Sequence, residues 1–356
     1  MSTRVIPLLF LFSFFGFSQN HFTLSGSVYE SEGQETLIGA NVIFPELNTG
    51  TITNEYGFYS ITLPKGTYSL TISYLGYNTV TEIIILDQNL NRNFSLDAAA
   101  DALDEIVLET NAERINIKTP QMSVNALNAN TIKQIPVVFG EADVVKAITL
   151  LPGVSNGGEG TGGFNVRGGS NDQNLILLDE ATLFNSSHLF GFFSVFNPDA
   201  IKSLKLYKGG IPAKYGGRVA SVLDIYQKEG NKNEFHGNGG IGLIASRILL
   251  EGPLEKEKGS FLFGGRSTYA HLFLPLFDVD NIAYFYDLNT KLSYRLDANN
   301  KIYLSGYFGR DVFNVSNSFE NTYGNTVVNF RWNHLFSDQL FSNLSLIYSD
   351  FIMVWI

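Results

Sequence analysis

Hydrophobic and polar residues alternate with a period of two through residues 22–96. In TYSLTISYLGY, small hydroxyl side chains occupy one face, and the other face carries Tyr68, Leu70, Ile72 and Tyr74. Such alternation is typical of a half-buried strand in an antiparallel sheet. Turn residues separate several short runs of this kind, for example at residues 54–57 and at the Pro-Lys-Gly of residues 64–66. Residues 19–97 are therefore predicted to form a small β-sandwich.

Residues 120–230 mix helical and extended patterns. The segment GEADVVKAITLLPG places Val144, Ile148 and Leu151 on one helical face, and its Pro-Gly pair stops the helix. A short helix also begins in NANTIKQIP and is halted by Pro136. Buried strands are predicted in NLILLDEATLF, IKSLKLYKGG and GGRVASVLDIYQK. These elements indicate a compact mixed α/β domain.

From about residue 234 onward only long alternating segments remain. There are about six: FHGNGGIGLIASRILLEGP, GSFLFGGRSTYA, NIAYFYDLNTKLSYRLD, KIYLSGYFGRDVFNV, NTVVNFRWNHLFS and QLFSNLSLIYSDF. Strands of roughly ten residues span a membrane in a β-barrel, with apolar residues toward lipid and polar residues toward the lumen. A soluble sandwich gives a similar pattern. The last segment ends on FIMVWI in mid-strand, and a plugged barrel needs about 22 strands, so we expect a truncated chain.

The first 18 residues have the three parts of a secretory signal peptide. Arg4 precedes an apolar run at residues 5–17, and the small Ser18 follows. This run is shorter than the roughly 20 residues of a membrane-spanning helix, and we expect cleavage near Ser18 or Gln19. No later segment has 18 unbroken apolar residues. The exported chain is therefore expected to cross a membrane only as a barrel.

Composition narrows the function classes. The chain has 29 Phe, 17 Tyr and 34 Gly but only 16% charged residues, against roughly 25% in soluble domains, and this bias fits a membrane barrel with aromatic girdles. A net charge of −10 argues against a nucleic-acid-binding protein, which needs a basic face. The chain has no cysteine, which excludes disulfides, thiolate zinc sites and cysteine nucleophiles.

The stretch FNVRGGSNDQNLILLDEA, residues 164–181, places charges beside glycines and a buried run. Arg167 precedes a Gly-Gly corner, and the apolar run ends on Asp179 and Glu180. Isolated buried charges are unfavourable, so the stretch indicates an active site, a phosphate-binding loop or ion pairs inside a larger shell. The glycine loop NGGEGTGG lacks a following Gly-Lys-Ser/Thr. No histidine has an acid partner at motif spacing, which disfavours an exported hydrolase or a zinc peptidase.

Residues 98–119 are small, acidic and poorly periodic, which predicts an exposed linker. Within it, LDEIVLET at residues 103–110 has enough β-propensity to form a strand. The segment can be one more edge strand, or a segment that a partner recruits by β-augmentation. The local sequence leaves both alternatives open.

Two parts of the sequence resemble known families. The segment from SGSVYE to TISYLGY resembles the carboxypeptidase-regulatory-like, transthyretin-type sandwich, which Bacteroidota commonly place ahead of outer-membrane receptors. The blocks LPGVSNGGEGTGGFNVRGGSNDQNLILLDEATLF and NPDAIKSLKLYKGGIPAKYGGRVASVLDI resemble the plug of a TonB-dependent outer-membrane receptor, with its V-R-G corner, L-L-D strand and Y-G-G-R stretch in order. Many plugs carry glycine after the L-L-D aspartate, where this chain has Glu180. The resemblance covers essentially the whole chain.

The resemblance implies a mainly β chain of five parts. These are a signal peptide at 1–18, a transthyretin-like sandwich at 19–97, a linker at 98–119, a mixed α/β plug at 120–230 and the first strands of an antiparallel transmembrane β-barrel at 231–356. It also implies a TonB box in the linker, where the sequence has Asp104, Glu105, Ile106, Val107, Leu108 and Glu109. Charges inside a lumen need partners, so we expect ion pairs from Arg167, Asp179, Glu180 and Arg218.

The resemblance implies transport rather than catalysis, with no cofactor and no metal. A siderophore, cobalamin, glycan or peptide would bind from outside the cell, and TonB with its inner-membrane energising complex would shift the plug. The implied partners are TonB, the small ligand and outer-membrane lipid, but no nucleic acid. A surface lipoprotein is a further partner for which the sequence carries no mark. The implied location is the outer membrane, with the N-terminal domain in the periplasm.

Ligand contact is expected at the glycine loop and at FNSSHLFGFF. The residues concerned are Asn156, Glu159, Phe184, His188 and Phe190. The aromatic segment can instead pack against the barrel wall. A surface binding or structural β-protein, or a non-transporting fragment that keeps these domains without the pore, is the alternative to an importer.

Proline at position 106 tests the TonB-box assignment. Proline has no backbone N–H and interrupts strand pairing, so Ile106→Pro is expected to abolish transport by the complete receptor while ligand binding stays intact. Binding and uptake are measured on the same variant. Loss of binding would show that the assignment is wrong.

Overall fold

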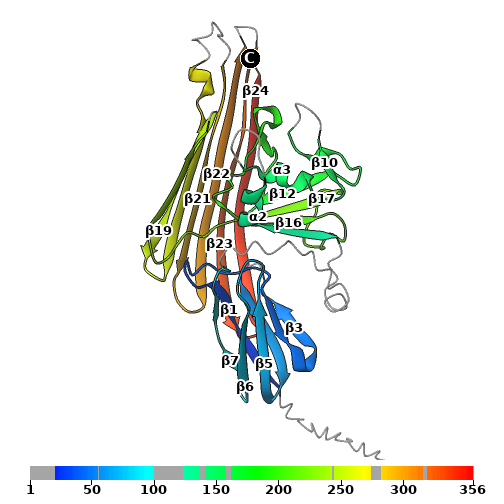
Figure 1. The fold of residues 1–356 in the computed structure, drawn as a ribbon, viewed down its shortest axis with the longest axis vertical. Helices are drawn as coiled ribbons and strands as arrows, with labels where there is room; N and C mark the ends of the chain where they lie inside the picture. Colours follow the sequence, from blue (N-terminus) through cyan, green and yellow to red (C-terminus); the bar gives the residue numbers. More distant parts are fainter. Residues whose placement is uncertain are drawn as a thin grey trace, which may run out of the picture.

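The computed structural model describes residues 21–54, 56–99, 123–135, 142–157, 162–242, 244–273, 282–315 and 319–355. Three bodies follow one another along the chain: a β-sandwich, a mixed α/β domain and a tall curved sheet (Figure 1). The mixed domain, called the plug below, lies against one face of the curved sheet, called the wall, and the sandwich lies beneath both. Among the described helices, none is long and apolar enough to cross a membrane.

The sandwich consists of two sheets packed over a common core. The first has the order β4-β1-β7, with β8 also paired to β1, and the second has the order β3-β2-β5-β6. Alternate side chains of β5, namely Tyr68, Leu70 and Ile72, are buried in this core, which confirms the period of two. The elements are β1 (His21–Glu30), β2 (Asn41–Phe44), η1 (Pro45–Leu47), β3 (Thr49–Ile52), β4 (Phe58–Pro64), β5 (Gly66–Ser73), β6 (Val80–Leu86), β7 (Leu90–Asn91) and β8 (Phe94–Leu96).

The plug is built on a five-stranded sheet of order β13-β12-β17-β16-β9, in which β12 and β17 run parallel. The predicted helices and buried strands are all present. The elements are β9 (Val124–Asn128), α2 (Ala129–Gln134), α3 (Val144–Thr149), β10 (Val154–Asn156), β11 (Phe164–Val166), η3 (Asn171–Gln173), β12 (Asn174–Leu178), β13 (Ala181–Thr182), β14 (Ser187–His188), η4 (Leu189–Gly191), β15 (Phe193–Ser194), β16 (Ile201–Tyr207) and β17 (Ser221–Gln227).

Helix α3 begins where its sequence supplies a cap. The Asp143 carboxylate accepts a hydrogen bond from the backbone N–H of Lys146 at 2.9 Å, which satisfies one of the free donors of the first turn. The same carboxylate accepts the N–H of Ser194 at 2.8 Å. The helix buries Val144 and Ile148 in the plug core. One aspartate therefore starts the helix and fixes it against β15.

The wall is a sheet of seven consecutive antiparallel strands. Six of them, β19 to β24, have ten residues or more, in agreement with the predicted number of about six, and the short β18 is a seventh because FHGNGGIGLIASRILLEGP divides into β18 and β19. The elements are β18 (His236–Ile241), β19 (Ala245–Glu255), β20 (Gly259–Thr268), η5 (Ala270–Leu272), β21 (Ile282–Arg295), β22 (Asn300–Val315), β23 (Phe319–Ser337) and β24 (Leu340–Trp355).

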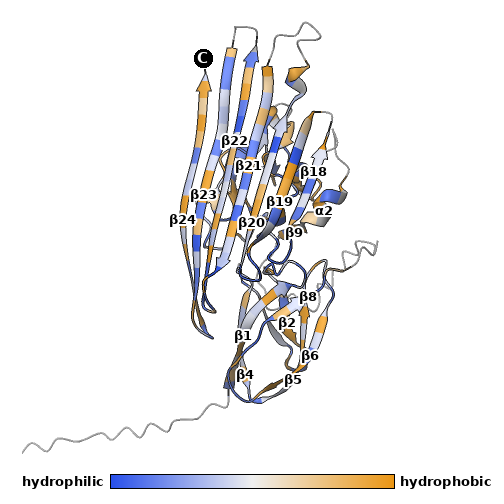
Figure 2. Ribbon diagram, turned by 90° about the vertical axis from the view of Figure 1, so that its left-hand side faces the viewer, coloured by the Kyte–Doolittle hydropathy of each residue, from blue (hydrophilic) through white to orange (hydrophobic). Residues whose placement is uncertain are grey.

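The two faces of the wall differ in polarity, as Figure 2 shows by the alternating colours along its strands. In β21 the residues that the plug buries include Asp287, Asn289 and Lys291, whereas Leu288 between them faces away and is exposed. In β23 the buried face carries four asparagines and Arg331, and the exposed face carries Val328, Phe330 and Trp332. This is the lipid-out, lumen-in alternation of a transmembrane barrel strand.

Candidate functional site

The turn after β12 carries the first contact between plug and wall. Asp179 and Glu180 both have left-handed backbone conformations, with φ of 47° and 73°, and such strain costs on the order of 1–3 kcal/mol for each residue. The turn directs both carboxylates out of the plug sheet. The Asp179 carboxylate lies 3.1 Å from Lys291 Nζ of β21, accepts the backbone N–H of Gln227 at 3.1 Å and is 2% exposed.

Glu180 reaches past the plug to two other bodies. Its Oε1 accepts the Tyr56 hydroxyl of the sandwich at 2.9 Å and lies 3.7 Å from the Arg331 guanidinium of β23. Its Oε2 accepts the hydroxyl of Ser345 on β24. The Arg331 guanidinium also lies over the Tyr56 ring at 4.9 Å. The two acids therefore divide their roles: Asp179 joins plug to wall, and Glu180 joins plug, wall and sandwich.

A second polar contact centres on His188, which is 1% exposed between plug and wall. Its Nδ1 lies 2.6 Å from Asp311 Oδ2 and its Nε2 lies 3.2 Å from Asp287 Oδ2. The ring stacks on Phe285 with centroids 4.2 Å apart, and the hydroxyl of Tyr307 lies 3.1 Å from Nε2. All of these partners lie on β21 or β22. His188 is therefore a plug side chain held in a pocket of the wall.

Arg266 of β20 completes this pocket. Its guanidinium lies 2.6 Å from Asp287 Oδ2 and donates to the backbone carbonyl of Ser194 in the plug at 2.7 Å. Burial by itself lowers the pKa of His188, but Asp311 and Asp287 outweigh it and raise the pKa above its ordinary value. Two carboxylates thus face the Arg266 guanidinium and an imidazole whose protonated form they favour, which supplies the partners that buried charges require.

The remaining predicted ion-pair residues lie elsewhere. Arg167 is exposed and donates to the Ser123 hydroxyl at 2.9 Å. Arg218 is exposed, donates to the carbonyl of Gly217 and lines a cavity of about 210 Å³ in the plug. Among the described residues, neither Arg167 nor Arg218 forms an ion pair with an acid. The ion pairs predicted for these two arginines are therefore not found in the described part of the chain.

The expected ligand-contact residues separate into two groups. His188 and Phe190 face the wall, where Phe190 packs on Phe313 with ring centroids 4.2 Å apart; wall packing is the alternative that the sequence had left open. Phe184 is 54% exposed and lines the same 210 Å³ cavity as Arg218. Asn156 is exposed at the end of β10. Glu159 and the six TonB-box residues lie outside the described residues.

Sequence reasoning missed a third cluster, centred on Glu229 where the plug chain enters the wall. The Glu229 carboxylate is 5% exposed and lies 3.1 Å from Lys232 Nζ and 3.0 Å from Lys301 Nζ. Burial by itself raises the pKa of this carboxyl, but Lys301, Lys232 and Lys202 hold it well below its ordinary value. Two features of the sequence could have indicated this cluster: the charged residues Lys228 and Glu229 directly after a buried strand, and the inward-facing Lys301 in β22.

A serine-centred pentapeptide, GVSNG at residues 153–157, has the spacing of a hydrolase nucleophile elbow. An elbow joins a strand to a helix, whereas this segment runs from α3 into β10. Ser155 is exposed and pairs with Asn165 in the β10–β11 ladder. The geometry therefore differs from an elbow. Among the described residues, no three His, Asp or Glu side chains are grouped so as to hold a metal ion.

Two protein-family models match the sequence. The CarboxypepD_reg-like domain matches residues 24–108, and the TonB-dependent Receptor Plug Domain matches residues 116–222. The TonB-dependent receptor SusC of Bacteroides thetaiotaomicron is 27% identical over 227 residues, which cover 59% of this chain and 21% of that protein.

Solved structures share the fold. The siderophore receptor PirA from Pseudomonas aeruginosa has 19% identity and a TM-score of 0.50, over 67% of this chain and 42% of its own. The alcaligin outer membrane receptor FauA from Bordetella pertussis has 13% identity and a TM-score of 0.50, over 67% of this chain and 40% of its own. The chain thus spans less than half the length of these relatives.

We expect the attachment of the plug at the His188 pocket to depend on pH. Because the pKa of His188 is raised in the folded protein, its stabilisation is complete below the ordinary value of 6.5 and is lost as the pH rises through the raised value. Unfolding of the plug by denaturant can be followed by the hydrogen exchange of the β12 amides. The denaturant concentration at the midpoint of this unfolding is expected to fall over that pH range. His188→Ala leaves Asp311 buried without its cation and is expected to cost about 3–5 kcal/mol. A midpoint with the same pH dependence in His188→Ala as in the unmodified chain would contradict this role.

Proposed function

We propose, because the chain belongs to the TonB-dependent receptor family, that it is the N-terminal part of an outer-membrane importer whose plug is moved by TonB. Members of this family are outer-membrane proteins with their N-terminal domains in the periplasm. The wall of this chain then faces lipid with its apolar side, and the sandwich lies on the periplasmic side. Membership of the family is the premise, and the import activity, the ligand and the partners of the whole protein are what we propose.

The observation that carries the proposal is the chemistry of the plug–wall interface. Its buried wall residues include Asp287, Asn289, Lys291, Asp311 and Arg331. The apolar contacts among the described residues are fewer: Tyr307 and Val327 of the wall join the plug's apolar core, Leu249 and Leu262 cluster with the plug's Ala200, and Phe285 and Phe313 pack on plug rings. Polar groups exchange protein partners for water when an interface opens, so opening it costs much less than exposing an apolar core of the same area. Such an interface suits a domain that must be displaced and return.

TonB is the proposed source of force. Residues 104–109 lie between the sandwich and the plug in the chain, so a pull on them reaches the plug through its first described strand, β9. β9 pairs with β16 at the edge of the plug sheet, where a strand can be peeled one hydrogen bond at a time. The proposed partners are TonB with its inner-membrane complex, outer-membrane lipid and a small ligand; the sequence favours no surface lipoprotein.

The ligand is proposed to be a scarce nutrient of the siderophore, cobalamin, glycan or peptide class. Asn156 and Phe184 are proposed for it because both are exposed, whereas His188 is buried against the wall and the partly exposed Phe190 packs on Phe313. Glu159 in the same glycine loop is proposed with them. Binding rather than catalysis is proposed, with no cofactor.

Growth and uptake of a deletion strain test this function. Cells lacking the complete gene are expected to lose uptake under one of three limitations, iron, cobalamin or glycan, and to regain it when the complete gene is restored. Because the transport step is energised, a protonophore is expected to stop uptake while surface binding of the ligand persists. Undiminished uptake by the deletion strain in every condition would contradict the proposal, as would restored uptake that persists with the protonophore.

A further inference from the structure

The sandwich makes its first contact with the plug through Tyr56, in the turn before β4. The Tyr56 hydroxyl donates to Glu180 Oε1 at 2.9 Å, and Glu180 occupies a left-handed position with φ of 73°. Glycine adopts this conformation without strain, whereas glutamate does not. The plug therefore holds a strained residue whose carboxylate is stabilised by partners that come from outside the plug.

The second contact is at Thr36, in the loop between β1 and β2. The Thr36 hydroxyl donates to Glu229 Oε1 at 2.6 Å, and the backbone N–H of Glu229 donates to the Glu35 carboxylate at 2.9 Å. The plug's Lys202 lies 3.2 Å from Glu35 and donates to the carbonyl of Thr36. The loop thus contacts the plug at two places: at Lys202 in strand β16 of its sheet, and at Glu229, just after the end of β17.

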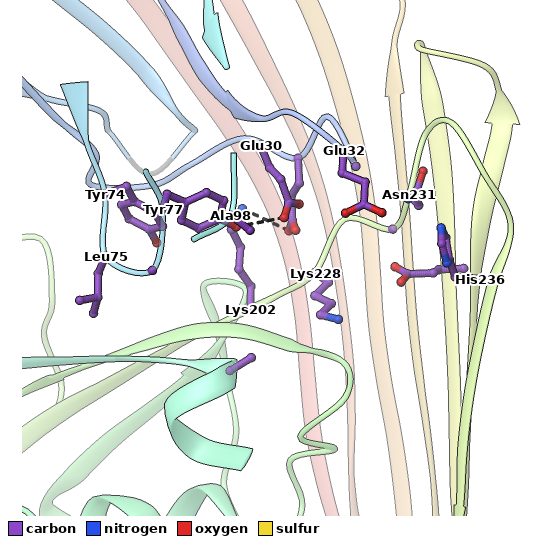
Figure 3. Close-up of a pocket in the computed structure, with 16 residues that line it drawn as sticks. Glu30, Glu32, Tyr74, Leu75, Tyr77, Ala98, Lys202, Lys228, Asn231 and His236 are labelled. Carbon is purple, nitrogen blue, oxygen red and sulfur yellow. Dashed lines mark hydrogen bonds and ion pairs between the residues drawn. The ribbon is translucent and has the colours of Figure 1, made fainter. Parts of the chain in front are cut away.

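A polar cavity of about 310 Å³ lies beside this loop, between sandwich, plug and the start of the wall. Figure 3 shows Lys202 extending from the plug toward Glu30 and Tyr77 of the sandwich. Glu30 accepts the Tyr77 hydroxyl at 3.2 Å, and Lys228 lines the same space. The sandwich and the plug therefore meet through polar groups with room for water between them, so this contact can open without exposing an apolar surface.

The sandwich is also fixed to the wall, independently of the plug. The turn between β23 and β24 lies on strands β1 and β4: Ser25 donates to Asp338 Oδ1 at 3.2 Å, and Ser60 donates to the Asp338 carbonyl at 2.8 Å. Phe341 stacks on Tyr56 and Phe58, with ring centroids 5.0 and 5.7 Å apart. The sandwich thus contacts the wall at the β23–β24 turn and the plug at Glu180 and Glu229, and Tyr56 takes part in both contacts.

We propose that the sandwich is a clamp on the plug: anchored at the β23–β24 turn, it holds Glu180 through Tyr56 and Glu229 through Thr36. Both acids belong to the plug, and both also contact the wall, through Arg331 and Lys301. Plug displacement pulls the two acids away from their partners in the sandwich and in the wall at once, so release of the sandwich is a step in plug movement. The clamp rests on the proposed function only in that the plug must move.

Removal of the two clamping hydroxyls tests this inference on the complete receptor. Tyr56→Phe with Thr36→Val removes both donors and keeps the ring stack on Phe341. Loss of two hydrogen bonds is expected to raise hydrogen exchange of the β12 and β17 amides by about tenfold, because exchange follows the opening equilibrium. The control, Tyr68→Phe with Thr71→Val, removes two hydroxyls whose partners, Pro64 and Thr81, lie within the sandwich.

The position of the sandwich is measured in parallel by spin-label distances. The chain has no cysteine, so labels at Ile83→Cys on β6 and Lys256→Cys on the β19–β20 turn report one distance between two exposed sites. The clamp predicts faster plug exchange in the test variant and not in the control. It predicts an unchanged distance in both, because the sandwich keeps its contacts with the β23–β24 turn.

Three results would overturn the clamp. A broadened distance in the test variant would show that the two hydroxyls, and not the contact with the β23–β24 turn, hold the sandwich in place. Unchanged plug exchange in the test variant would show that the sandwich does not hold the plug. Equal effects in test and control would show that only the stability of the sandwich itself was changed. Neither readout needs ligand or TonB, so failure of the import proposal would leave both measurements valid.

Discussion

A carboxylate removed from water must find cationic partners or hydrogen-bond donors, and this requirement organises the contact between plug and wall. Asp179 is 2% exposed and has Lys291 as its cation, and Asp287 has Arg266 and His188. Breaking one buried pair by removing one partner costs about 3–5 kcal/mol, although the pair itself stabilises much less than that relative to apolar residues. Such contacts therefore fix position strongly while contributing little net adhesion.

This combination suits the proposed displacement of the plug, which requires a domain that sits in one place and can still leave it. An apolar seal would fix the plug by area, and its opening would expose all of that area to water. A polar interface is position-specific because each acid must meet its own cationic partners, and water can replace the partners on opening. The turn at Asp179 and Glu180 also favours position over stability. Both residues adopt a strained left-handed conformation, and from there their carboxylates contact the plug, the wall and the sandwich.

Periodicity predicts which face of a strand is buried, and for this reason the strands and their buried faces could be predicted from the sequence. The alternation in NIAYFYDLNTKLSYRLD predicts its lumen face, and the apolar run before Asp179 and Glu180 predicts β12 and a pair of acids beyond it. Pairing is different, because Asp179 and Lys291 are 112 residues apart and no local pattern relates them. His188 was equally compatible with ligand contact and with wall packing for the same reason: the deciding acids, Asp287 and Asp311, lie on other strands. The Gly-rich β18 shows the limit of counting strands, since glycines provide no alternation.

The most direct test of the account is a double-mutant cycle on Asp179 and Lys291 in the complete receptor. Asp179→Asn and Lys291→Met are made singly and together, and the free energy of plug unfolding is measured from denaturant titrations followed at β12 by hydrogen exchange. If this buried pair holds the plug, each single variant is destabilised by about 3–5 kcal/mol and the double variant by clearly less than their sum. Effects that add to within about 0.5 kcal/mol would show that the two charges do not act as a pair, and would contradict the account.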